Sequence, residues 1–209
     1  MRHPWGPLAL LSALAACGTP DRPELDYLPP SGAPAASRSA FVQQQPWLVW
    51  GNLLDHLQQR GLQVAELDEP SGEIVVAYSG DPEPYVDCGW IVVYGEDELD
   101  RVPAAQSDSS FRRRIEGDVV MLERDLRLAA RMNVKLEPDG EATVVRAEST
   151  YLLTKTVTPE DSQEPLHEET IRFGTGESAS FVSTTICQPN GKLERLVLDA
   201  LPAVSVAGG

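Results

Sequence analysis

Apolar and polar residues alternate most regularly between about Arg124 and Leu136. The apolar positions are Leu126, Leu128, Ala130, Met132, Val134 and Leu136. A period of two residues is typical of a strand that has one face buried and the other in solvent. The turn residues 137–140 follow, and residues 141–157 alternate again. The pattern therefore predicts an antiparallel hairpin built from two long strands.

Shorter strands are predicted on both sides of this hairpin. Residues 62–67 and 73–79 flank a stretch rich in turn residues at 68–72, which predicts a second hairpin. The other predicted strands cover 89–94, 170–173 and 180–186, and the predicted loops cover 95–111 and 158–167.

Two segments have the period of an amphipathic helix. Pro46 suits the first position of one helix, and Gly61 suits its end. The apolar stripe predicted to be buried is Trp47, Trp50, Leu53, Leu54 and Leu57. A second helix is predicted after Asn190, a candidate N-cap. This order predicts an α+β fold, in which an N-terminal and a C-terminal helix pack on one antiparallel sheet.

The first residues of the chain resemble the export signal of a bacterial lipoprotein. Arg2 and His3 precede a short apolar run, and Leu14-Ala15-Ala16-Cys17 is similar to a lipobox. The resemblance implies that residues 1–16 are removed and that Cys17 carries a lipid that holds the chain on a membrane. Because Gly18 and not aspartate follows Cys17, the resemblance implies the periplasmic side of the outer membrane. The alternative is an ordinary secretory signal that contains a cysteine.

Residues 17–40 are predicted to be a flexible tether after the lipidated cysteine. Five prolines lie among small residues there, a composition that buries too little apolar surface to fold. Tyr27 and Leu28 form an apolar island, which is a candidate motif for binding a protein partner or, alternatively, an incidental part of the linker. A single domain is predicted over 41–201, and residues 202–209 are predicted to be a tail.

The net charge of −15 argues against a nucleic-acid partner, because nucleic acids favour basic surfaces. Basic residues nevertheless follow the outward face of the strongest strand, at Arg127, Arg131 and Lys135, after the run 112–114 of three arginines. This strip is a candidate docking surface for an acidic envelope partner or polymer. The alternative is a solvated face whose charge is balanced by acids on neighbouring strands.

Cys88 and Cys187 are the cysteines that remain when Cys17 carries lipid. Disulfides persist in the compartments to which proteins are exported, so these two are predicted to form one; two separate buried thiols are the alternative. The sequence has no histidine at metal-ligand spacing from a cysteine, no nucleophile elbow and no phosphate-binding glycine loop. We therefore expect a protein that is not an enzyme and that binds no metal or cofactor.

One part of the chain is similar to a helix-grip module of BamC-type lipoproteins, which belong to the machinery that assembles outer-membrane β-barrels. The similar positions are Trp47, Leu53, Leu54, Leu57, Gly61, Val64, Asp68, Gly72, Ile74 and Val75. The resemblance covers about residues 40–80 and implies a non-catalytic accessory that presents a domain near the membrane. The alternatives are a domain that binds a small apolar ligand or lipid between helix and sheet, and an enzyme acting on an envelope polymer.

Overall fold

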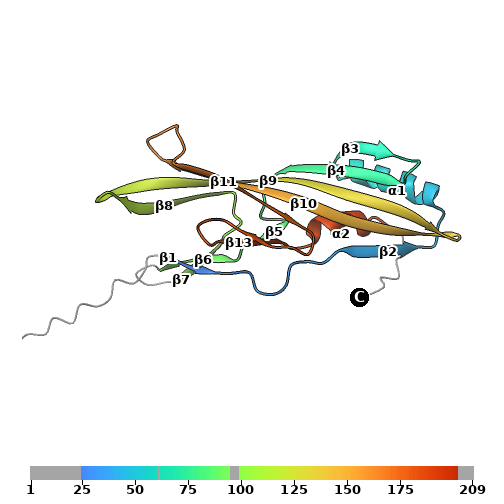
Figure 1. Cartoon of the computed structure of the whole chain (residues 1–209), viewed down its shortest axis with the longest axis horizontal. Helices are drawn as coiled ribbons and strands as arrows, with labels where there is room; N and C mark the ends of the chain where they lie inside the picture. The colour runs from blue at the N-terminus through green and yellow to red at the C-terminus, as the bar shows by residue number, and fades with distance from the viewer. Residues whose placement is uncertain (1–24, 61, 95–98, 202–209) are drawn as a thin grey trace, which may run out of the picture.

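The computed structural model describes residues 25–60, 62–94 and 99–201. Strands make up most of the described part, and two helices accompany them (Figure 1). In chain order the elements are β1 (Leu25–Leu28), β2 (Arg38–Val42), α1 (Pro46–Gln59), β3 (Gln63–Asp68), β4 (Glu73–Gly80), β5 (Val86–Asp87), β6 (Trp90–Tyr94), β7 (Leu99–Pro103), β8 (Asp108–Ile115), β9 (Asp118–Asp139), β10 (Ala142–Pro159), β11 (His167–Gly174), β12 (Ala179–Ser180), β13 (Ile186–Pro189) and α2 (Lys192–Leu198).

The predicted long hairpin is confirmed and forms the centre of the molecule. β9 has 22 residues and β10 has 18, and their pairing extends from Ala142 opposite Asp139 to Pro159 opposite Leu122. They belong to a seven-stranded antiparallel sheet with the order β11-β10-β9-β4-β3, in which β2 also pairs with β10 and β8 with β9. The predicted second hairpin is also confirmed, as β3 and β4.

The core lies on one face of this sheet. Leu128, Met132 and Val134 of β9 are buried there, together with residues of β4, β10 and both helices. Helix α1 begins at Pro46 as predicted. Leu53 and Leu57 of the predicted stripe are buried, and Trp50 and Leu54 are partly buried against the core. Val49 is buried, whereas Trp47 is 67% exposed. The aromatic residue at the start of the helix therefore lies outside the core.

The predicted α+β fold with two helices packed on a sheet is wrong, because the chain is mainly β. A helix rises about 1.5 Å per residue and a strand about 3.3 Å. The 14 residues of α1 and the 7 of α2 therefore span only about 21 Å and 10 Å, against about 70 Å for the 22 residues of β9. Neither described helix is long and apolar enough to span a bilayer.

Two parts of the chain that were expected to be irregular form strands instead. β1 and most of β2 lie within the predicted tether, yet β1 pairs with β6 and β2 pairs with β10. β7 and the first half of β8 lie within the predicted loop 95–111. The predictions for the signal, residues 1–16, for Cys17 and for the tail, residues 202–209, fall outside the described residues.

The predicted disulfide is confirmed. Cys88 and Cys187 are bonded across a sequence separation of 99 residues, and both are buried. Cys88 follows β5 and Cys187 lies in β13, and these two strands pair at Asp87 and Gln188. The bond therefore links the middle of the chain to the strand that leads into α2.

We predict that Cys88→Ser and Cys187→Ser each lower the free energy of unfolding by about 4–5 kcal/mol, because a closed loop of about 100 residues restricts the unfolded chain by that amount. The double substitution should cost no more than either single one, since both remove the same bond. Urea denaturation of the three variants measures this. Additive losses would show that the two side chains stabilise the fold independently.

Candidate binding face

The second face of the main sheet is open to solvent. Along β9 the side chains of Arg127, Ala129, Arg131 and Asn133 alternate with the buried ones and are exposed. β10 continues the pattern, with Leu152 exposed between two buried neighbours. We call this surface the outer face. Its polar and apolar side chains are available for contact because none of them is needed to fill the core.

A groove of about 900 Å³ crosses the outer face. Side chains from β4, β9, β10 and β11 line it, and small residues at Ala77, Ser79 and Ala129 leave room between the longer ones. The volume is within the range of pockets that hold small ligands, but the groove is open and more than one of its lining residues is charged. These features favour a partner that lies across the sheet over a ligand that is enclosed by it.

The predicted basic strip lies on the outer face, but each of its cations has an acidic partner. Arg131 donates to Glu66 at 2.8 Å, and Lys135 donates to Glu73 at 2.8 Å. Arg127 pairs with Asp125 on its own strand and with Asp108 of β8. The charge of the strip is thus balanced by nearby acids, which agrees with the alternative of a solvated face. Partner binding at these three residues stays a prediction.

Arg172 is a residue of the groove that the sequence reading missed. It lies on β11 directly opposite Leu152 of β10, and it is exposed. Within the described part of the chain its guanidinium makes no ion pair, and the side chain of Leu152 is 42% exposed. A free cation therefore lies beside an exposed apolar side chain. The alternation of 170–173 contained this signal, because Arg172 occupies an outward position of a predicted strand.

Tyr27 and Leu28 have structural partners in a different sheet. The Tyr27 hydroxyl donates to the backbone oxygen of Ile186 at 3.1 Å and accepts from its backbone N–H at 2.9 Å. Burial raises the pKa of Tyr27. Leu28 is half-buried and pairs with Trp90 of β6. Both residues thus help to join β1 to the folded part, and partner binding at Tyr27 and Leu28 stays a prediction.

A buried carboxylate lies behind the groove. Glu194 of α2 is 1% exposed, and its Oε1 accepts hydrogen bonds from the hydroxyls of Tyr151 at 2.8 Å and Thr175 at 3.0 Å. Burial, followed by the nearby charge of Glu194, raises the pKa of Tyr151. The Tyr151 hydroxyl therefore stays protonated and acts as a donor. Glu194 Oε2 and Ser149 Oγ have no hydrogen-bond partner among the described residues.

A second polar cluster lies on the inner face, toward the far end of β10. Lys155 is buried, and its ammonium group donates to Ser183 at 2.9 Å, pairs with Glu169 at 3.4 Å and lies 4.2 Å from the ring centre of Phe181. Burial lowers the pKa of Lys155, although Glu169 acts in the opposite direction. These contacts hold residues 181–183 against the sheet.

Each of the two clusters joins elements that are distant in the sequence. The Glu194 carboxylate is enclosed, and Lys155 is engaged by three neighbours. Among the described residues, no group of three or more histidine, cysteine, aspartate or glutamate side chains could hold a metal ion. The arrangement is therefore best suited to fixing α2 and the 181–183 segment in place.

The pKa of Glu169 lies below its ordinary value of 4.5. Burial alone would raise this pKa, but the hydrogen bond from the Val182 N–H and the contacts with His167 and Lys155 lower it by more. A carboxylate with a lowered folded-state pKa stabilises the fold above its ordinary pKa, and this contribution is lost as the pH falls through the lowered value.

We therefore predict that the free energy of unfolding of the native chain falls as the pH drops below about 4.5 and that Glu169→Gln makes this fall less steep. Urea denaturation at several pH values between neutral and acidic conditions measures the slope. Glu168→Gln, at the exposed neighbouring position, is the matched control. An unchanged slope in Glu169→Gln would contradict the assigned role.

Comparison with known proteins assigns no family to this chain. No family model, no curated protein and no solved structure matches it. The residues of the chain itself therefore carry the functional argument.

Proposed function

We propose that this chain is a non-catalytic lipoprotein of the bacterial envelope that binds a protein partner through its outer face. Cys17 carries the lipid, and the folded part lies on the periplasmic side of the outer membrane. The role is that of a binding or assembly accessory, and assembly of outer-membrane proteins is the process that the sequence resemblance suggests. The lipobox, Leu14-Ala15-Ala16-Cys17, supports the anchor.

The observation that carries the proposal is the buried Cys88–Cys187 disulfide. Disulfides of this kind form and persist in oxidising compartments, such as the periplasm, and are rare in the cytosol. The bond is therefore consistent with an export signal at the start of the chain. Of the three cysteines in the sequence, Cys17 is the one outside this bond, which suits a site of acylation.

The groove supports binding as the function. Arg172 offers a guanidinium without an ion-pair partner in the described residues, and Leu152 offers apolar contact beside it. A polypeptide segment with a carboxylate next to an apolar side chain has the complementary chemistry. By contrast, Val49, Leu53 and Leu57 of α1 have no exposed surface, so the contact between helix and sheet gives less support to a bound apolar ligand.

We predict that Cys17→Ser abolishes incorporation of a clickable fatty acid and moves the protein from the membrane fraction to the soluble periplasmic fraction. The matched control is the double variant Cys88→Ser with Cys187→Ser, which keeps Cys17 and should still be labelled. Gel fluorescence and fractionation of cells measure both properties. Export of an unlabelled, soluble native chain would remove the basis of the proposal.

The partner is tested by a photo-crosslinking amino acid placed at Thr150, which lines the groove. In the lipidated protein in cells we expect a discrete crosslinked product that mass spectrometry identifies as an envelope protein. Arg172→Glu should remove this product, whereas Arg38→Glu, a charge reversal on the exposed part of β2, should leave it. Equal crosslinking in both charge variants would exclude the groove as the binding surface.

A further inference from the structure

The hairpin of β8 and β9 carries the densest positive charge of the described chain. Arg112, Arg113 and Arg114 are consecutive on β8, all three are exposed, and none makes an ion pair with a described residue. Val119 lies opposite Arg114 and is 63% exposed. Because side chains alternate along a strand, Arg112 and Arg114 lie on the same face as Val119, and Arg113 lies on the opposite face. This end of the hairpin therefore presents free guanidinium groups on both faces, in a protein whose net charge is −15.

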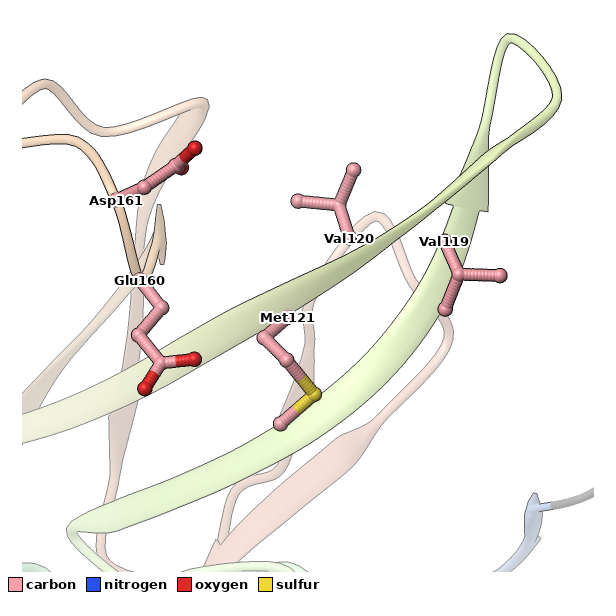
Figure 2. A pocket seen from close by; sticks show the side chains of 5 residues that line it. All are labelled: Val119, Val120, Met121, Glu160 and Asp161. Atoms are coloured by element: carbon pink, nitrogen blue, oxygen red, sulfur yellow. The ribbon is translucent and has the colours of Figure 1, made fainter.

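The basic and acidic side chains near the hairpin lie on opposite edges of β9. β8, with the arginines, pairs with one edge, and the end of β10 pairs with the other, where Leu122 meets Pro159. Glu160 and Asp161 follow on that second edge and face Val119, Val120 and Met121 across a hollow of about 310 Å³ (Figure 2). Glu116 and Asp118 lie at the turn of the hairpin and partly offset the arginines.

The hairpin also lies at the end of the molecule that the anchor would hold. In Figure 1 its tip projects beyond β1, and β1 lies at the same end. The first described residue, Leu25, is eight residues after Cys17. Eight residues of extended chain span at most about 29 Å. A lipid on Cys17 therefore keeps Leu25, at the start of β1, within that distance of the bilayer surface.

We propose that the tip of the β8–β9 hairpin is a membrane-contacting surface, in which Arg112 and Arg114 on one face and Arg113 on the other bind the phosphate groups of anionic lipids, and Val119 enters the headgroup region. This inference rests on the lipid anchor of the proposed function. Guanidinium groups match phosphate oxygens in charge and geometry, and each cation near an anionic bilayer strengthens attachment.

The anchor and the hairpin act together. Glu116 and Asp118 weaken the attraction between the hairpin and an anionic surface, and salt screens it further, so the contact without the lipid is strongest at low ionic strength. A lipid on Cys17 raises the local concentration of the hairpin at the bilayer, and two weak attachments then bind more tightly than either one. The contact would also fix the orientation of the sheet on the membrane. The alternative is that the arginines only protect the edge strand β8 from aggregation, and in that case they would not make the protein bind anionic lipid.

The test uses the full exported chain with Cys17→Ser, which carries its disulfide but no lipid. Its binding is measured by flotation with vesicles of phosphatidylglycerol and phosphatidylcholine in equal parts, and with vesicles of phosphatidylcholine alone, at low ionic strength. We expect binding to the anionic vesicles only, and a loss of about tenfold or more when Arg112, Arg113 and Arg114 are all replaced by Gln. The matched control replaces Arg127, Arg131 and Lys135 by Gln, which removes the same charge from the middle of the sheet.

Three results would overturn the proposal: no binding to the anionic vesicles, equal binding to both kinds of vesicle, or equal losses in the two triple variants. Circular dichroism and the intact disulfide check that each variant is folded. The experiment is independent of lipidation. If binding depends on the arginines but the native chain carries no fatty acid, the hairpin proposal is supported and the lipid anchor is contradicted. If the native chain carries a fatty acid but binding does not depend on the arginines, only the hairpin proposal is contradicted.

Discussion

The register between β9 and β10 is the constraint on which the rest of the structure depends. Leu128 lies opposite Leu153, and Ala130 lies opposite Tyr151, so the apolar positions of both strands fall on the same face. A slip of one residue would move every one of them to the solvent side. The register thus decides at once which side chains fill the core and which form the outer face with its groove.

The length of this hairpin also explains the polar clusters inside the molecule. The helices span only part of the sheet, and farther along the hairpin its inner face carries Arg124 and Lys155 in place of apolar residues. Burial lowers the pKa of both groups, so each needs polar contacts to remain there. Ser183 and Glu169 supply polar contacts to Lys155, and the ring of Phe181 lies against its ammonium group. The chain between β12 and β13 is therefore held by Phe181, which is buried in the apolar core, and by the polar contacts of Lys155.

The sequence predicted the elements that depend on neighbouring residues and missed those that depend on distant ones. Pro46 and the helical period located α1, and strict alternation located β9 and β10. β1 could not be predicted in this way, because a short segment such as Leu25–Leu28 becomes a strand only by pairing with β6, more than sixty residues later. The prediction that Trp47 is buried was wrong for a related reason, since the contacts of α1 with the sheet and not its own pattern leave this side chain in solvent.

The same limit applies to the candidate sites, because a cation is free or neutralised according to what the next strand carries. Arg131 and Lys135 stood out in the sequence as a basic strip, yet β3 and β4 bring Glu66 and Glu73 to them. Arg172 stood alone in its strand, and pairing with β10 places Leu152 beside it with no described acid in contact. The number of basic residues in a segment therefore does not identify a binding surface in so acidic a chain. Arg172 on β11 and Arg112, Arg113 and Arg114 on β8 make no ion pair with a described residue, and this could be known only once the pairing of the strands was known.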